Sequence, residues 1–455
     1  MSSAEKIAKQ ARVAGNVLKT ISDENRSKIL YRIRDALANA KDEIESANKE
    51  DLEQARAGGL ADSLVKRLDL FKGDKFDVML QGISDVADLE DPVGKVKMAR
   101  EIDNGLMLYQ VTAPVGVILV IFESRPEVIA NITALCIKSG NAGILKGGKE
   151  SVNTFKAMAK VVNQTIEQYK DETGVPVGAV QLIETRQDVS DLLGQDEYID
   201  LVVPRGSNSL VRQIKDSTKI PVLGHADGIC SIYVDRDADL EKAKRIVLDA
   251  KTNYPAGCNA MEGLLLNPDF SQWDDVLHHL ITEGGVTIHA TTDVKEAFLK
   301  KLQDSGKLND DIKAKIVDAK DGDFDKEFLS LDCAVKFIPN TVDAINHINE
   351  HSSKHTDAII TESKEDAEKF LKGIDSSGVY WNASTRFADG FRYGFGTEVG
   401  ISTSKIHARG PVGLDGLVTY QYQIRGDGQV ASDYLGAGGN KAFVHKDIDV
   451  TNIKL

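Results

Sequence analysis

One of the four cysteines in this 455-residue chain lies in a sequence that suits a nucleophile. Cys258 follows Pro-Ala-Gly at 255–257, and this proline and glycine predict a tight turn that can present a thiol to a cavity. A nucleophilic thiol needs that partial exposure and a lowered pKa. Cys136, Cys230 and Cys333 lie inside apolar runs, where free cysteine usually packs as a small hydrophobic residue. A buried loop cysteine is the alternative for Cys258.

Two turns between a predicted strand and a predicted helix carry basic residues together with glycine. They span residues 144–151 and 203–208. Glycine lets the backbone approach a ligand, and the N–H groups of a starting helix suit phosphate. A plain strand-to-helix turn, or simple helix capping, is the alternative for each turn taken alone. Two such turns in one sheet favour a bound polyanion, and the candidate residues are Lys146, Gly147, Lys149, Arg205, Gly206 and Ser207.

Further cations lie in three turn-rich segments. Arg125 follows Ser124, Arg386 ends a Ser-Thr-Arg segment, and His407 and Arg409 precede a Gly-Pro pair. Arginine and histidine in such turns can bind a carboxylate or phosphate on a substrate. A solvated surface turn is the alternative for each segment.

Three histidines recur every four residues, which would align them on one helix face like metal ligands. They are His347, His351 and His355. However, serines at 352 and 353 weaken that helix near its end, and no neighbouring cysteine or carboxylate completes a ligand set. A helical C-terminal turn with cationic residues near its carbonyl groups is the preferred interpretation, so we predict no metal site.

The elements that must position these residues form two alternating blocks. Short apolar strands and helices alternate over residues 115–234 and again over 262–382, which is typical of parallel, doubly wound sheets. We therefore predict two α/β domains, with Cys258 near their junction, where clefts usually form. Predicted strands are 115–121, 142–145, 180–183, 199–203, 229–234, 263–266, 335–338, 358–361 and 378–381, and predicted helices begin near 127, 151, 187 and 207.

Composition narrows the class of protein. The net charge of −14 argues against a nucleic-acid groove or an anionic membrane surface as the main partner. No run approaches the ~18 apolar residues of a membrane span. Four separated cysteines without a CxxC pair argue against a disulfide framework and a structural zinc site. We expect a soluble protein of the reducing cytoplasm.

Taken together, these motifs resemble the γ-glutamyl phosphate reductases of the aldehyde dehydrogenase superfamily. The resemblance implies an α/β fold with two doubly wound domains and a β oligomerisation element. It runs from near the N-terminus to about residue 428, and many separate motifs occur in the expected order. The matching stretches are APVGVILVIFESRPEV, ILKGGKES, VPRGSN, VLGHADGICSIYVD, TNYPAGCNA, HINEHSSKHTDAII, SSGVYWNASTRF and STSKIHARGPVGLDGL.

The resemblance implies a reaction and a role for each candidate residue. The reaction is the NADPH-dependent reduction of L-glutamyl 5-phosphate to L-glutamate 5-semialdehyde and phosphate, the second step of proline biosynthesis. Cys258 would form a thioester with the substrate, and Ser124 would occupy the position of an oxyanion donor. The implied cofactor residues are Lys146, Gly147, Lys149, Arg205, Gly206, Ser207 and Glu327, and the substrate residues are Arg125, Asn382, Arg386, His407 and Arg409.

One residue departs from the wider superfamily. Hydrolytic aldehyde dehydrogenases carry a glutamate that activates water before a Leu-Gly pair, and Val222 stands at that position here. The thioester should therefore resist hydrolysis. Val222 and Lys149 argue against the alternative of a hydrolytic NAD-dependent aldehyde dehydrogenase. Cys258, together with both glycine turns, argues against a non-catalytic binding or scaffold protein.

The resemblance also implies a division of the chain and its partners. An exposed strand pair is costly unless paired, so we predict a homo-oligomer. The acyl phosphate should be labile, which favours handover from a glutamate 5-kinase. The expected parts are an NADPH-binding domain (1–95 and 114–233), a catalytic domain (234–404), oligomerisation strands (96–113 and 405–428) and a C-terminal tail (429–455).

Overall fold

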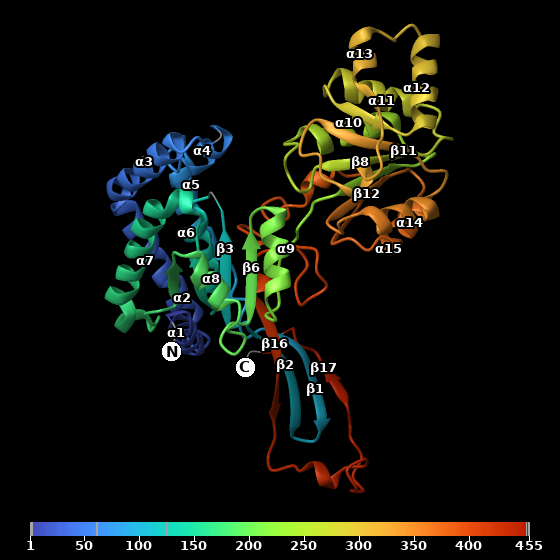
Figure 1. Ribbon diagram of the computed structural model, residues 1–455. Helices are drawn as coiled ribbons and strands as arrows, with labels where there is room; N and C mark the ends of the chain where they lie inside the picture. The colour runs from blue at the N-terminus through green and yellow to red at the C-terminus, as the bar shows by residue number, and fades with distance from the viewer. Residues whose placement is uncertain (1–2, 61, 124, 452, 454–455) are drawn as a thin grey trace.

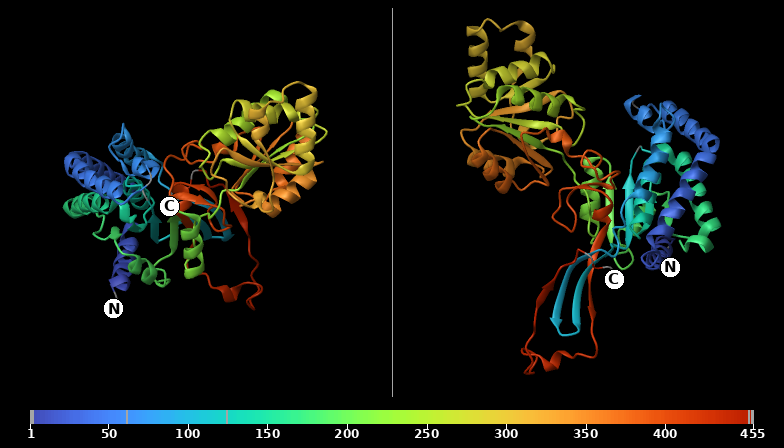
Figure 2. Two further views of the ribbon diagram at one scale, coloured as in Figure 1. Left: turned by 45° about the horizontal axis from the view of Figure 1, so that its top comes forward. Right: turned by 180° about the vertical axis from the view of Figure 1, so that it is seen from behind.

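The computed structural model describes residues 3–60, 62–123, 125–451 and 453, and its elements follow the apolar patterns of the sequence. Two α/β domains lie side by side, and a narrow β-sheet projects away from both (Figures 1 and 2). Among the described helices, none is long and apolar enough to cross a membrane.

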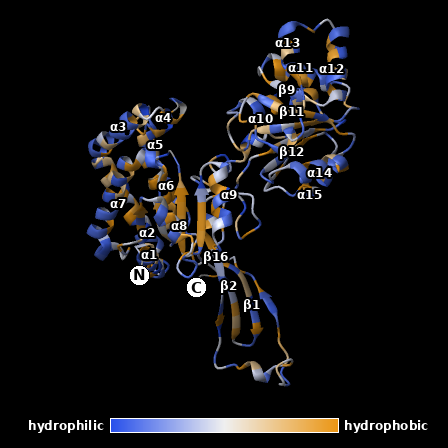
Figure 3. Cartoon of the chain, viewed as in Figure 1, coloured by the Kyte–Doolittle hydropathy of each residue, from blue (hydrophilic) through white to orange (hydrophobic). Residues whose placement is uncertain are grey.

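The N-terminal domain is built on a parallel sheet with the strand order β5-β4-β3-β6. All six residues of β3 are buried, as expected for a strand whose sheet is covered by helices. Figure 3 shows the hydrophobic strands inside and hydrophilic residues on the outer helices. The strands are β3 (Val117–Phe122), β4 (Ala142–Lys146), β5 (Val180–Ile183) and β6 (Leu201–Arg205).

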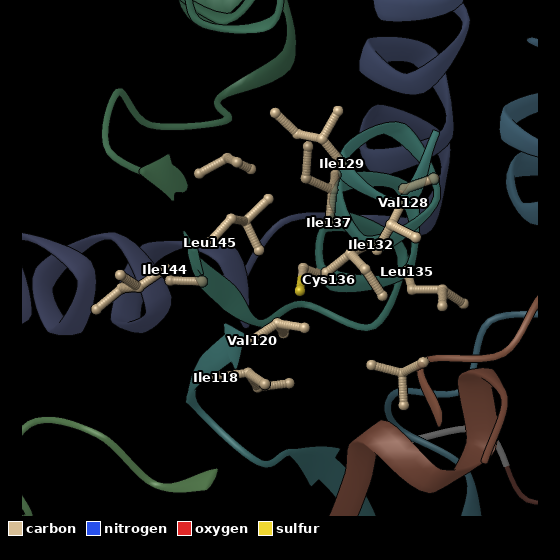
Figure 4. Packing of buried hydrophobic residues seen from close by; sticks show 14 of the residues in the cluster. Ile118, Val120, Val128, Ile129, Ile132, Leu135, Cys136, Ile137, Ile144 and Leu145 are labelled. Carbon is tan, nitrogen blue, oxygen red and sulfur yellow. The ribbon is translucent and has the colours of Figure 1, made fainter. Parts of the chain in front are cut away.

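The helices of this domain form one continuous core with the sheet. Cys136 is completely buried between α6 and the strands, beside Ile118, Val120 and Ile132 (Figure 4). Helix α1 likewise buries its stripe of small residues. The helices are α1 (Ser3–Leu18), α2 (Asp23–Asn39), α3 (Lys41–Ala57), α4 (Asp62–Leu68), α5 (Lys75–Asp88), α6 (Val128–Lys138), α7 (Val152–Thr173), α8 (Arg186–Leu192) and α9 (Asn208–Ser217).

The second domain contains a larger parallel sheet with the order β10-β9-β11-β8-β7-β12-β13. Cys230 on β7 and Cys333 on β11 are buried, which confirms the prediction for these two cysteines and for Cys136. The strands are β7 (Cys230–Val234), β8 (Met261–Leu266), β9 (Thr287–Ala290), β10 (Ile316–Asp318), β11 (Asp332–Phe337), β12 (Thr356–Ile360) and β13 (Gly378–Trp381).

Helices pack on both faces of this sheet and produce two hydrophobic clusters. They are α10 (Leu240–Thr252), α11 (Trp273–Thr282), α12 (Thr292–Asp304), α13 (Asp310–Ala314), α14 (Thr341–His351) and α15 (Lys364–Gly373).

The projecting sheet is antiparallel and has the order β16-β2-β1-β17. Strand β16 pairs with β2 from Val418 opposite Pro114 to Arg425 opposite Met107. Strand β17, which comes from the tail, pairs with only three residues of β1. The strands are β1 (Val96–Asp103), β2 (Leu106–Pro114), β16 (Val418–Arg425) and β17 (Lys446–Ile448), and a separate pair is formed by β14 (Gly400–Ser402) and β15 (Gly410–Val412).

The sequence predicted most of these elements closely. Strands 180–183 and 378–381 are observed with the predicted bounds, and helices α6 to α9 begin within one residue of their predicted starts. The sequence analysis missed β9, β10, α12, α13, β14, β15 and β17.

Candidate active site

Cys258 lies in the turn that connects α10 to β8. Tyr254 has a left-handed backbone (φ 67°), and the N–H of Gly257 donates to its carbonyl oxygen at 3.0 Å. The N–H of Ala260 then donates to the carbonyl of Gly257 at 2.9 Å. A Cβ on Gly257 would lie only 2.6 Å from the Arg386 guanidinium. The predicted tight turn is therefore confirmed, and it brings the Cys258 backbone against an arginine.

The thiol of Cys258 is the only half-buried one among the four cysteines, all of which lie in the described part of the chain. Burial raises its pKa to about 12, and the carboxylates of Glu327 and Glu398 act in the same direction. The Arg386 guanidinium opposes this effect. The expectation of a lowered pKa is therefore wrong for the protein without substrate, because the sequence did not reveal which carboxylates surround the sulfur.

Two imidazoles lie beside the thiol. The nearest ligand atoms of His225, Cys258 and His355 all lie within 4.8 Å of one another. The two imidazole rings are nearly perpendicular, with centroids 5.1 Å apart. Nδ1 of His225 lies 3.1 Å from the carbonyl oxygen of Ile401, whereas Nε2 of the completely buried His355 has no hydrogen-bond partner in the described structure.

The sequence analysis missed His225 and grouped His355 with the wrong neighbours. His347 and His351 do lie together on α14, with ring centroids 4.3 Å apart. His355 lies beyond the end of that helix, in the loop before β12, and faces His225 instead. The sequence analysis preferred a helix end with cationic residues in its last turn, and α14 does end at His351, so His355 lies outside the helix and not on the face of His347 and His351.

Arg386 is a cation that packs against the cysteine turn and acts electrostatically on the thiol. It lies in a short 3₁₀ turn, Thr385–Phe387, and is 9% exposed. Its guanidinium lies over the ring of Tyr254 at 5.8 Å, and its Nε has no partner within the described residues. A buried arginine with an open donor is suited to an anionic substrate.

Glu327 connects the cysteine turn with the N-terminal domain. One carboxylate oxygen accepts a hydrogen bond from the N–H of Gly228 at 2.7 Å, and the other accepts one from the Asn208 amide at 2.9 Å. Asn208 is the first residue of α9. Gly228 packs so closely that an added Cβ would lie 2.0 Å from the carbonyl oxygen of Cys258. The Glu327 carboxylate thus joins the cysteine turn, through Gly228, to the start of α9, where a cofactor phosphate is predicted to bind.

The two glycine turns lie at the same edge of the N-terminal sheet, since β4 and β6 both flank β3 in parallel. A Cβ on Gly147 would lie 2.0 Å from the Phe155 ring. A Cβ on Gly206 would lie 2.6 Å from the Glu123 carboxylate. Both turns therefore leave no room for a side chain beside the backbone.

The N-terminus of α9 already holds a carboxylate. The N–H of Ser207 donates to Oε2 of Glu123 at 3.1 Å. Because helix N-termini attract anions, this contact marks the position where a cofactor pyrophosphate would fit. Lys149 is exposed at the neighbouring turn, and Lys146 bonds to the carbonyl of Gly147.

The remaining predicted substrate residues are not all brought together. The Asn382 side chain bonds in both directions with the backbone of Thr361, at 3.0 Å each. His407 contacts the carbonyl of Gly416 at 2.9 Å, and Arg409 donates to the carbonyl of Asp375 at 2.7 Å. His407 and Arg409 line a cavity of about 430 Å³.

Ser124 and Arg125 come shortly after β3 in the sequence. Arg125 is exposed, and its charge acts on Arg205, which ends the adjacent strand β6. Cys258 also acts electrostatically on Arg205. Ser124 lies outside the described residues. Val222 is held beside β6 by an isolated bridge to Val202, so an apolar side chain occupies that part of the sheet edge.

The chain is similar to known proteins over its full length. The model of the aldehyde dehydrogenase family matches residues 1–283. The gamma-glutamyl phosphate reductase of Saccharomyces cerevisiae is 77% identical over 456 residues, covering 100% of both chains. The crystal structure of gamma-glutamyl phosphate reductase from Thermotoga maritima, 36% identical, superposes with a TM-score of 0.86 over 94% of this chain and 100% of that one. An acetylating aldehyde dehydrogenase from Geobacillus thermoglucosidasius, 16% identical with a TM-score of 0.62 over 94% of this chain and 97% of that one, shares the fold.

Proposed function

The chain belongs to the aldehyde dehydrogenase family and, within it, to the γ-glutamyl phosphate reductases, and we propose that it reduces L-glutamyl 5-phosphate to L-glutamate 5-semialdehyde with NADPH. The observation that carries this proposal is the Glu327 bridge between the cysteine turn and the start of α9. The Glu327 carboxylate holds the turn that carries Cys258 beside the N-terminus of α9, whose N–H groups suit a dinucleotide phosphate.

The first step is attack by the Cys258 sulfur on the acyl carbon of the substrate. A sulfur–carbon bond forms, the bond from that carbon to the phosphate oxygen breaks, and inorganic phosphate leaves. A ring nitrogen of His225 and one of His355 lie within 4.8 Å of the sulfur, so either imidazole would accept the thiol proton after a small movement. Arg386 would stabilise negative charge on the sulfur and on the departing phosphate, since its guanidinium opposes the burial and the two carboxylates that raise the pKa of the thiol.

The fit of a dinucleotide rests on backbone geometry. The N-terminus of α9, Gly147 and Gly206 would hold its phosphates, and Lys149 would pair with a 2′-phosphate. When bound, the nicotinamide group supplies the hydride that reduces the thioester. The Cys258 sulfur then leaves from the reduced carbon and is regenerated as the aldehyde is released.

Protection of the thioester from water is part of the same proposal. The apolar Val222 stands beside β6, where the hydrolytic members of the superfamily place a glutamate. Without a base there, water is not activated for attack on the acyl carbon. The acyl group is therefore retained until it is reduced.

We further propose a cytoplasmic homo-oligomer that receives its substrate from a glutamate 5-kinase. Four free cysteines suit a reducing compartment. Strand β16 forms an open edge of the projecting sheet and exposes Tyr420, Tyr422 and Ile424 by more than half. An edge of this kind is usually paired with another chain.

Dependence on phosphate tests the proposal in the reverse direction. Oxidation of glutamate 5-semialdehyde with NADP⁺ should require added phosphate, because phosphate must attack the thioester. An equal rate without phosphate would indicate the hydrolytic reaction instead. Cys258→Ser should reduce turnover at least about a thousandfold, whereas the matched variant Cys333→Ala should remain active. Full activity in Cys258→Ala would exclude the covalent route.

A further inference from the structure

We propose that His225, Cys258 and His355 form a binding site for a zinc-like divalent cation, which reversibly masks the thiol. The three side chains come from three separate segments: the loop before β7, the turn before β8 and the loop before β12. This set of two imidazoles and one thiolate is typical of zinc and related soft or borderline cations.

The separations are close to those of a metal centre. The three nearest ligand atoms lie within 4.8 Å of one another. Tetrahedral zinc with bonds of about 2.1 Å to nitrogen and about 2.3 Å to sulfur places its ligands roughly 3.5 Å apart. The ligand atoms would therefore move together by at most about 1.3 Å on binding.

The hydrogen bonding of His225 prepares one ligand atom. A carbonyl oxygen only accepts, so the 3.1 Å contact between His225 Nδ1 and the Ile401 carbonyl places the imidazole proton on Nδ1. Nε2 of the neutral ring then carries a free lone pair. A ligating histidine usually donates its other ring N–H to a carbonyl or carboxylate in this way.

His355 supplies an independent indication that something binds here. Its side chain is completely buried, and its Nε2 has no hydrogen-bond partner within the described residues. A buried imidazole nitrogen without a protein partner keeps its lone pair available to a cation. Its Nδ1 lies 3.0 Å from the Thr356 hydroxyl, which fixes the orientation of the ring.

Charges of both signs surround the thiol. Glu327 and Glu398 act electrostatically on Cys258 in the sense that favours a cation, whereas Arg386 and Arg205 oppose them. Binding replaces the thiol proton with the metal: a metal–sulfur bond forms, the sulfur–hydrogen bond breaks, and one proton is released without any oxidation or reduction. The metal-bound sulfur then cannot attack an acyl phosphate until a chelator removes the cation.

Cobalt(II) titration of the full-length chain tests the site directly. We expect one bound Co²⁺ with a near-ultraviolet thiolate-to-cobalt absorption band, which Zn²⁺ displaces. Cys258→Ser should abolish the band, and His225→Asn and His355→Asn should each weaken Co²⁺ binding at least about tenfold. His347→Asn is the matched control, because His347 pairs with His351 on α14 away from the thiol, and it should leave the band unchanged.

Two measurements keep the test decisive if the buried His355 variant does not fold. The first is Co²⁺ binding by His225→Asn, since His225 is only half-buried and its replacement disturbs the fold less. The second is alkylation of Cys258 in the wild-type chain, which should remove the absorption band. Absence of the band in wild type would overturn the site, as would unchanged affinity in His225→Asn. The readout is binding rather than turnover, so its failure would not touch the proposed reaction.

Discussion

The two α/β domains contribute to the candidate active site in different ways. The N-terminal domain offers backbone groups and space, through Gly147, Gly206 and the N–H of Ser207. The second domain offers titratable side chains that are buried or half-buried, including Cys258 and His355. The comparison indicates that recognition of phosphate needs donors and room, whereas covalent chemistry needs side chains whose protonation the interior has changed.

The second domain has buried charge at the base of the cysteine turn. Lys251 at the end of α10 donates to Glu262 on β8 at 2.7 Å, and their side chains are 0% and 1% exposed. Burial raises the pKa of Glu262 to about 7 against the effect of Lys251. These two residues flank the turn that carries Cys258, so the pair fixes both of its ends.

The largest effect is expected when this pair is broken. Lys251→Met should cost about 3–5 kcal/mol of unfolding free energy, because Glu262 would remain buried without its partner. Denaturant unfolding measures the loss. The pKa of Glu262 is raised to about 7, so its carboxyl is protonated in both folded proteins below that pH, and the cost should be small there and grow as pH rises above 7.

The double variant Lys251→Met/Glu262→Leu is the control for that prediction. Replacing both charges with apolar groups should restore stability to near the wild-type value. If Lys251→Met alone left the unfolding free energy unchanged at pH 8, the stability of the second domain would not depend on this buried ion pair. The proposed difference between the two domains would then be wrong.

The next effect concerns the reactivity of Cys258 itself. A pKa of about 12 instead of 9.0 leaves about a thousandfold less thiolate at pH 8. Higher intrinsic nucleophilicity recovers part of this, so alkylation by iodoacetamide should be roughly 30- to 60-fold slower than in the urea-unfolded chain. Peptide mass spectrometry measures both rates. Since the pKa of Cys258 is raised, the alkylation rate of the folded chain should climb with pH up to about 11. A rate that stops rising below pH 8 would contradict the raised pKa.

A smaller effect is expected in the N-terminal domain. Gly147→Ala would place Cβ against the ring of Phe155, which is buried and packs edge-on against Phe122. Overpacking of this kind costs about 1–3 kcal/mol. Gly194→Ala is the control, because its nearest contact would be an ordinary 3.6 Å. Equal unfolding midpoints for the two variants would show that the turn has room for a side chain.

The smallest effect tests whether Glu123 occupies the place of a phosphate. Glu123→Gln removes the negative charge from the N-terminus of α9, so NADPH should bind about two- to fivefold more tightly. Calorimetry on the full chain measures the change. Glu172→Gln, which alters an exposed carboxylate paired with Lys28 at the far end of α7, should leave the affinity unchanged. Weaker binding in Glu123→Gln would mean that this carboxylate contacts the cofactor favourably.

The parts of the site that were predictable depend on neighbours in sequence. The turns before α7 and α9 and the turn around Cys258 are specified by adjacent glycine, proline and capping residues. Their positions followed from local pattern alone.

The parts that were not predictable depend on residues far apart in the chain. His225 meets Cys258 and His355 only because β7, β8 and β12 are neighbours in the second sheet. The raised pKa of the thiol depends first on its burial and then on Glu327 and Glu398, and no local motif connects either carboxylate with Cys258. Asn382 could not be recognised as a backbone clamp until its left-handed conformation and its bonds to Thr361 were known.

Strand β17 has a consequence for how copies of this chain can add to one another. By pairing with Ala99, Arg100 and Glu101, the tail covers one edge of the projecting sheet, while β16 leaves the other edge open. A long run of unpaired strand backbone can pair with another chain, whereas a three-residue edge strand offers few backbone groups for such pairing. The tail therefore replaces part of the exposed β1 edge with a much shorter one, and its removal would lengthen the run of backbone open to pairing on that side.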